Sequence, residues 1–218
     1  MSKELKKRIT TSIILFILAV LCISINYVVF SITLIIVLSI SFIEWSNINY
    51  KYFSKKKYFL IFDQYLFIKL IGVCYVVLVF YSSLSLRNEG IIFFIFILSI
   101  CIFSDVGGYI FGKSIGGKKL TKISPNKTVS GSLGSFITSL APLLLFNFQL
   151  TLKNILFCLV VSLSCQMGDL IISYFKRLNK VKDTGNILPG HGGLLDRIDG
   201  IIFAIPTVHV LKNYIGIF

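Results

Sequence analysis

Long apolar runs separated by short charged segments dominate the pattern of hydrophobic and polar positions in this chain. The first run carries no charged residue from Ile9 to Ile43, which is longer than the about 20 residues that one helix needs to cross a bilayer. Ser24 to Asn26 offers a turn inside this run, so we expect two spans there. The later apolar runs predict five more spans, near Leu70–Leu86, Ile91–Phe111, Leu133–Phe148, Ile155–Ile172 and Leu194–Val210.

The predicted fold is therefore an all-α, polytopic integral membrane helical bundle with about seven transmembrane helices. We divide it into residues 1–90, which hold the first three spans, and residues 91–218, a catalytic region with charged loops at 112–128 and 173–197. Composition supports this fold, since 56% of the 218 residues are hydrophobic and the mean hydropathy is +0.87. A soluble domain of such composition could not cover itself with polar surface.

The net charge of +13 would also suit a nucleic-acid-binding protein, but the basic residues lie between apolar runs and not on one soluble face. We therefore expect no nucleic-acid partner. With the N-terminus inside, most Lys and Arg fall in the inner segments 3–8, 51–57, 113–127 and 176–197, as the positive-inside rule requires. We expect a protein of a bacterial cytoplasmic membrane, with the polar loops and the active site facing the cytoplasm.

The stretch from Ser164 to Gly200 concentrates charge between two apolar runs. It contains four of the nine acidic residues of the chain, which are Asp169, Asp183, Asp196 and Asp199. If the preceding helix continues, Asp169, Ser173 and Lys176 lie on one helical face at i, i+4 and i+7. The alternative is a cytoplasmic loop whose charges pair with one another in water, but ionisable groups at a membrane edge are costly to keep without a function.

After this loop, the next helix is expected to begin near Leu194, which places Asp196 and Asp199 on one face of its first turns. Carboxylates held close together repel unless a cation sits between them. Oxygen ligands without imidazole or thiolate favour Mg²⁺. We therefore predict a magnesium site formed by Asp169, Asp196 and Asp199, opposite a phosphate that the neighbouring Lys and Arg side chains bind.

Two features of residues 91–127 need separate interpretation. Asp105 lies inside the predicted fourth span, and a carboxylate at such a position is a candidate functional residue, although a satisfied helix-end Asp is the alternative. The segment from Gly107 to Ser114, GGYIFGKS, formally matches the P-loop pattern. Since that motif requires a strand before it and a helix after it, we interpret the match as accidental.

The string SYFKRLNKVKDTGNILPGHGGLLDRID resembles the characteristic motif of the phosphatidate cytidylyltransferases (CDP-diacylglycerol synthases). The positions that carry the resemblance are Ser173, Lys176, Arg177, Lys182, Asp183, Pro189, His191, Gly192, Gly193, Asp196, Arg197 and Asp199. A second segment, SPNKTVSG from Ser124 to Gly131, is similar to another part of the same family's pattern. Two positions depart from it, because Ser130 and Ile172 stand where members usually carry Glu.

The resemblance implies transfer of CMP from CTP to phosphatidate, giving CDP-diacylglycerol and pyrophosphate. Together with the charge pattern, it predicts that Asp169, Lys176, Asp196 and Asp199 are catalytic. The residues predicted to bind substrate are Lys127, Thr128, Ser173, Arg177, Lys182, His191 and Arg197. The expected cofactor is Mg²⁺, with a monovalent cation left open, and the expected partners are CTP, phosphatidate and the bilayer, with a homodimer left open.

Alternatives remain at this stage. His191 could be a general acid or base, a phosphate donor or a polar turn residue, and we favour phosphate binding because a phosphate monoester needs little base to attack. A lipid or polyprenol kinase using CTP or ATP would need a similar site. An ion-coupled transporter is less well supported, since its charges should lie at the membrane midplane between repeats.

Overall fold

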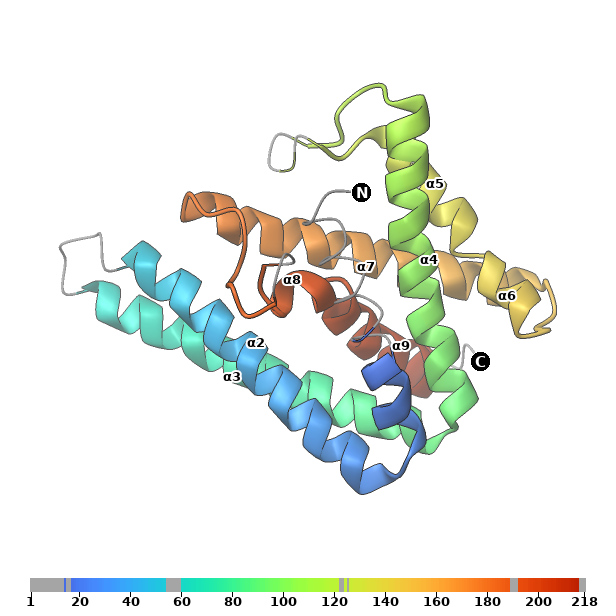
Figure 1. The fold of residues 1–218 in the computed structure, drawn as a ribbon, viewed down its shortest axis with the longest axis horizontal. Helices are drawn as coiled ribbons and strands as arrows, with labels where there is room; N and C mark the ends of the chain where they lie inside the picture. The colour runs from blue at the N-terminus through green and yellow to red at the C-terminus, as the bar shows by residue number, and fades with distance from the viewer. Residues whose placement is uncertain are drawn as a thin grey trace. The chain divides into compact units, whose positions relative to one another are not determined.

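The computed structural model describes residues 14, 17–53, 60–121, 124, 126–188 and 192–215. Over these residues the chain is helical and forms no strand beyond two isolated β-bridges, so the all-α prediction is confirmed. Residues 17–24 are helical. The labelled helices are α2 (Tyr27–Phe53), α3 (Leu60–Asn88), α4 (Ile91–Ile115), α5 (Val129–Thr138), α6 (Ala141–Leu145), α7 (Leu152–Leu178), α8 (Leu195–Ile198) and α9 (Ile201–Ile215) (Figure 1).

Within the described part of the chain, four helical segments are long and apolar enough to cross a membrane, at Tyr27–Tyr50, Tyr65–Asn88, Ile91–Ile115 and Leu152–Leu178. Two further apolar helical segments, Val129–Leu145 and Ile201–Asn213, are shorter. The protein is therefore a helical membrane protein with four candidate spans. The count of about seven stays a prediction, and much of the first predicted span lies outside the described residues.

Several helices differ from the predicted spans. The span predicted near Leu133–Phe148 consists of the two helices α5 and α6, and α3 begins before the span predicted near Leu70–Leu86. Helix α7 does not end near Ile172 but continues to Leu178, because Lys176 and Arg177 in its last turn complement the negative end of the helix dipole. It ends where Lys180 adopts a positive φ of 57°, and the Val181 amide donates to the Lys176 carbonyl at 3.0 Å. These are features of a helix C-cap.

The helix expected to begin near Leu194 is interrupted after four residues. Helix α8 ends at Ile198, Asp199 and Gly200 form a turn, and α9 begins at Ile201. Asp199 therefore does not lie one helical turn after Asp196 in a continuous helix. Gly200 fits here because a Cβ at this position would lie 3.0 Å from the Cys165 carbonyl oxygen, closer than packed side chains tolerate.

The described chain packs as two compact units. The first consists of residues 1–81 and 175–198, so it contains α2, most of α3, the end of α7, the α7–α8 loop and α8. Helices α2 and α3 run side by side in it (Figure 1), and the Ser46 hydroxyl lies 3.2 Å from the Tyr65 hydroxyl. Trp45 of α2 packs edge-on against Phe175 of α7, with ring centroids 4.5 Å apart.

The second unit consists of residues 82–174 and 199–218, and glycines bring α4 and α5 into close contact within it (Figure 1). A Cβ added at Gly107 would lie 2.8 Å from the Gly134 carbonyl oxygen, and one at Gly131 would lie 2.8 Å from that of Gly108. Small residues permit such backbone approach between membrane helices. Since Gly107 to Ser114 lie inside α4, the P-loop match is accidental, as predicted.

Candidate active site

A polar cavity of about 310 Å³ opens in the second unit, between α4, α5, α7 and the loop before α5. Its volume is at the lower end of the range of small-molecule sites. The residues that line it are Asp105, Gly108, Tyr109, Leu120, Ser124, Asn126, Lys127, Thr128, Gly131, Ser132, Ser135, Gln166 and Asp169. The two predicted site residues Lys127 and Asp169, from distant parts of the sequence, form an ion pair in this wall.

Lys127 is held in place by the backbone of its own loop. The Leu120 amide donates to the Lys127 carbonyl at 2.8 Å, and the Val129 amide donates to the Lys118 carbonyl at 3.0 Å. Thr128, which follows, is the N-cap of α5, and its hydroxyl accepts a hydrogen bond from the Gly131 amide at 3.1 Å. Capping of this kind fixes the start of a helix, so Thr128 has a structural role here in addition to lining the cavity.

Ser130 lies where the resemblance leads one to expect Glu. Its hydroxyl donates to the Gly116 carbonyl and lies 3.0 Å from the Thr128 hydroxyl. These contacts join the start of α5 to the end of α4. Ser130 therefore stabilises the loop that carries Lys127, and it brings no negative charge to the cavity.

Asp169 collects several of the predicted polar partners. The Ser173 hydroxyl, one turn later on α7, donates to Asp169 Oδ1 at 3.2 Å, as the shared helical face predicted. The Asp199 side chain lies close enough to Asp169 for a side-chain hydrogen bond, and Asp199 Oδ1 also accepts from the Gly200 amide at 2.9 Å. Two carboxyl groups this close repel unless a proton or a positive charge lies beside them, and Lys127 supplies one positive charge to Asp169.

Asp105 of α4 also lines this cavity, and its side chain is exposed. The Cys165 thiol of α7 lies 3.7 Å from Asp105 Oδ1 and donates to it. The carboxylate predicted to be functional from its place inside a membrane span is thus on the surface of a polar cavity, together with Lys127 and Asp169.

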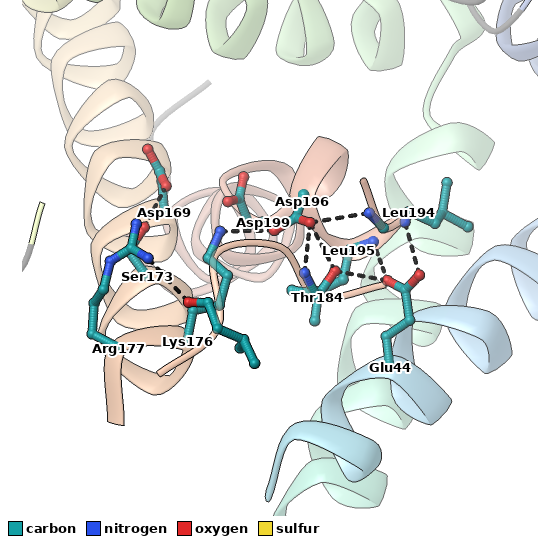
Figure 2. A network of polar contacts seen from close by, with 12 residues as sticks. Glu44, Asp169, Ser173, Lys176, Arg177, Thr184, Leu194, Leu195, Asp196 and Asp199 are labelled. Atoms are coloured by element: carbon teal, nitrogen blue, oxygen red, sulfur yellow. Dashed lines mark hydrogen bonds and ion pairs between the residues drawn. The ribbon is translucent and has the colours of Figure 1, made fainter. Parts of the chain in front are cut away.

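Lys176 and Asp196 form a second cluster, in the first unit (Figure 2). Lys176 Nζ lies 2.7 Å from Asp196 Oδ1, and both side chains are almost fully buried. Asp196 Oδ2 accepts from the Thr184 amide at 2.7 Å, the Thr184 hydroxyl at 3.1 Å and the Gly193 amide at 3.1 Å. A carboxylate has about four lone-pair directions, and these four donors account for them.

Three other predicted substrate residues belong to the same unit, namely Arg177, Lys182 and Arg197. Arg177 Nη1 donates to the Val181 carbonyl at 3.0 Å. This hydrogen bond stabilises the C-terminal end of α7. Lys182 and Arg197 are exposed. His191 lies outside the described residues.

The predicted three-carboxylate metal site is divided between the two units, since Asp196 belongs to the first and Asp169 and Asp199 to the second. No group of three or more His, Cys, Asp or Glu suited to a metal ion occurs among the residues that the structure describes. The Asp169–Asp199 pair nevertheless fits Mg²⁺, which commonly binds through one or two carboxylates and keeps several waters. The three-ligand site stays a prediction.

Glu44 of α2 was not identified from the sequence. Only 3% of it is exposed, and its carboxylate accepts from the Thr184 hydroxyl at 2.9 Å, the Leu194 amide at 3.0 Å and the Leu195 amide at 2.8 Å (Figure 2). The sequence did contain a signal, since Glu44 directly follows the uncharged run that ends at Ile43. Its partners, 140 and more residues later, could not be inferred from that position.

The sequence profile of the cytidylyltransferase family matches residues 63–215, which cover both the cavity and the Lys176–Asp196 cluster. The chain belongs to this family. The match includes α4, α5 and α7 in full, and it begins after Glu44.

Among curated relatives, the chain is similar to proteins named phosphatidate cytidylyltransferase. It is 42% identical over 149 residues to the one from Staphylococcus saprophyticus subsp. saprophyticus, a match that covers 65% of this chain and 57% of the relative. It is 42% identical over 148 residues to the one from Staphylococcus aureus (strain COL) and 43% over 148 residues to the one from Staphylococcus epidermidis (strain RP62A), with the same coverage. The matched region thus spans little more than half of each relative's length.

Proposed function

We propose that this protein is a phosphatidate cytidylyltransferase, which transfers CMP from CTP to phosphatidate and releases pyrophosphate. The observation that carries the proposal is the polar cavity in which Lys127 pairs with Asp169. Lys127 was predicted from the family resemblance, and Asp169 from the pattern of charged residues on one helical face. The names of the relatives support the same activity. The apolar helices around the cavity suit an enzyme whose second substrate is a membrane lipid.

In this reaction a phosphate oxygen of phosphatidate attacks the α-phosphorus of CTP. A new P–O bond forms there, the bond between the α-phosphorus and the bridging oxygen to the β-phosphate breaks, and pyrophosphate leaves with that oxygen. Because the attacking phosphate monoester is already an anion, no general base is required. Catalysis then consists of positioning the two phosphates and neutralising their charge.

Lys127 is placed to bind one of these phosphates at the cavity wall. Its ammonium is only partly buried, so a phosphate can replace or join Asp169 as its partner. The exposed side chains Arg177, Lys182 and Arg197 would bind further phosphate oxygens, and His191 would do the same. Ser173 orients Asp169 through the hydrogen bond between them.

Asp169 and Asp199 would hold Mg²⁺, and the role of Asp196 as a third ligand stays a prediction. The ion would supply charge neutralisation at the phosphates. Lys176 would act through Asp196, since their ion pair fixes the orientation of that carboxylate.

We further propose that the chain crosses a bacterial cytoplasmic membrane about seven times, with the N-terminus and the site on the cytoplasmic side. The distribution of Lys and Arg supports this arrangement. The two shorter apolar helical segments and the segment before α2 would supply the spans beyond the four long ones. A homodimer remains compatible with this proposal.

The decisive experiment is incubation of the purified protein with phosphatidate, Mg²⁺ and CTP labelled at the α-phosphate. CDP-diacylglycerol carrying the label, together with pyrophosphate, is the expected result. Labelled CDP as the product would instead indicate a lipid kinase, because a kinase transfers only the γ-phosphoryl group. Absence of any CTP turnover with phosphatidate would overturn the proposal.

A further inference from the structure

We propose that Glu44 is a positioning residue for the α7–α8 loop, the segment from residue 181 to residue 194, and that it acts on the reaction through Thr184 and Asp196. This proposal rests on the proposed function. It assigns a role to a residue of α2 that lies before the part of the chain matched by the family profile. In this role Glu44 would contact neither substrate nor metal itself.

The first argument is the set of donors around Glu44. The Leu194 amide donates to Oε1, and the Leu195 amide and the Thr184 hydroxyl donate to Oε2. The two amides lie at the start of α8. The first amides of a helix have no acceptor within that helix. A buried carboxylate is tolerated when it is hydrogen-bonded in this way. The Glu44 carboxylate and the donors of the loop therefore provide each other's hydrogen-bond partners.

The second argument is that these donors require a carboxylate. Backbone amides cannot reverse their role, and one amide points at each oxygen of Glu44. A Gln side chain has one oxygen and one NH₂ group. Whichever way this amide group is turned, its NH₂ group would face one of the two backbone N–H groups. One buried donor would then be left without an acceptor, which is costly. The site therefore distinguishes Glu from Gln although the two have nearly the same shape.

The third argument is the connection from Glu44 to the charged pair. The Thr184 hydroxyl lies 2.9 Å from Glu44 Oε2 and 3.1 Å from Asp196 Oδ2, so its proton is shared between two carboxylates. Asp196 in turn holds Lys176 at 2.7 Å. Figure 2 shows this line of contacts from Glu44 through Thr184 to Asp196 and Lys176. A shift of the loop away from Glu44 would therefore move the Asp196 carboxylate.

Glycines of the motif also pack against Glu44. A Cβ added at Gly193 would lie 2.6 Å from Glu44 Oε2, and one at Gly185 would lie 3.0 Å from Glu44 Cδ. The loop backbone thus approaches the carboxylate more closely than any residue with a side chain permits. Glu44, which lies far away in the sequence, thus contributes to the need for glycine at these positions, together with the Thr184 hydroxyl at Gly193.

The test compares Glu44→Gln with Ser41→Ala, using the purified full-length protein. Ser41 is one turn earlier on α2, is equally buried, and makes only a hydrogen bond to the Val37 carbonyl within its helix. We expect Glu44→Gln to lower kcat/KM, per folded molecule, by about 10²-fold, the loss typical of a misplaced catalytic group. Ser41→Ala should stay within about 2-fold of the original protein.

The second readout does not depend on activity. Hydrogen–deuterium exchange of the Leu194 and Leu195 amides should become faster in Glu44→Gln, whereas exchange in α4 should not change. A milder variant, Thr184→Val, keeps both amide bonds to Glu44 and should lose less activity than Glu44→Gln. The proposal is supported if the loss in kcat/KM and the faster exchange occur together.

Two outcomes would overturn it. One is that Glu44→Gln loses activity only because less of the protein folds, so that kcat and KM per folded molecule are unchanged. The other is unchanged exchange at Leu194 and Leu195. If the original protein makes no CDP-diacylglycerol, the proposed function fails, and the exchange experiment still decides whether Glu44 holds the loop.

Discussion

Lys127 and Asp169 form an ion pair in the wall of the polar cavity, although they are 42 positions apart in the sequence. Neither side chain is fully buried, so the pair contributes at most about 1 kcal/mol to stability. A partly buried pair of this kind can exchange partners when a phosphate enters. The pair therefore matters more for substrate binding than for the stability of the fold.

The first prediction concerns Lys127. Replacing it with Ala should lower kcat/KM for CTP by about 10- to 100-fold, since a charge-assisted hydrogen bond to phosphate is lost. The melting temperature should change little. Steady-state kinetics with varied CTP would measure the effect, with Lys153→Ala, a lysine in the first turn of α7, as the control. Unchanged kinetics for Lys127→Ala would remove this loop from the site.

The second prediction concerns the Asp169–Asp199 pair. Asp169→Asn and Asp199→Asn should each reduce the rate by about 10²- to 10³-fold, because the charge at the reacting phosphates is no longer neutralised. The double variant should be little worse than the poorer single variant, as for groups that act as one unit. Titration of activity with Mg²⁺ should show a raised requirement for the metal. Near-full activity of either variant at limiting Mg²⁺ would show that the carboxylates are structural.

The third prediction separates stability from activity at Lys176 and Asp196. Lys176→Met should destabilise the protein by about 3 to 5 kcal/mol, because it leaves a buried charge without its partner. The double variant Lys176→Met with Asp196→Asn should recover part of this loss but remain inactive, because the Asn oxygen can still accept from the Thr184 and Gly193 amides while no unpaired charge is left. Thermal unfolding and product assays on the same samples would measure both. A double variant no more stable than Lys176→Met would contradict the assignment of the cost to the unpaired carboxylate.

The helical character of this chain was predictable because long apolar runs leave the backbone few alternatives in a membrane. The contact between Asp169 and Ser173 was predictable too, since both lie one turn apart on one helix. The break at Asp199 and Gly200 was not, because it depends on how closely Gly200 approaches Cys165. Glu44 could not be connected to the motif for the same reason, since its partners are set by tertiary packing alone.

The fourth prediction concerns topology. With about seven spans and a cytoplasmic N-terminus, a reporter that works only in the cytoplasm should give no signal when fused to Phe218. A periplasmic reporter at the same position should be active. As a control, either reporter can be inserted in the loop between α4 and α5, where the opposite result is expected because of its lysines. A bright cytoplasmic reporter at the C-terminus would show that the number of spans is even.

The last prediction concerns Gly193, whose position next to Glu44 leaves no room for a side chain. In Gly193→Ala the new methyl group would clash with the Thr184 hydroxyl and would lie 2.6 Å from Glu44 Oε2 and 2.7 Å from the Gly185 amide nitrogen, so the loop must shift. Overpacking of this kind costs about 1 to 3 kcal/mol, and the displaced Gly193 amide would also weaken its 3.1 Å bond to Asp196. We therefore expect a lower melting temperature together with a lower kcat.

The matched control is Asn186→Ala, an exposed residue of the same loop, which should change neither quantity measurably. Combining Gly193→Ala with Glu44→Ala tests the cause. Glu44→Ala removes one of the clashing groups, but it also removes the acceptor and leaves the contacts of the new methyl group with Thr184 and Gly185. The double variant should therefore be less destabilised than the sum of the two single variants, without regaining activity. If the two substitutions were instead strictly additive in melting temperature, the contact between Gly193 and Glu44 would not contribute to the need for glycine there.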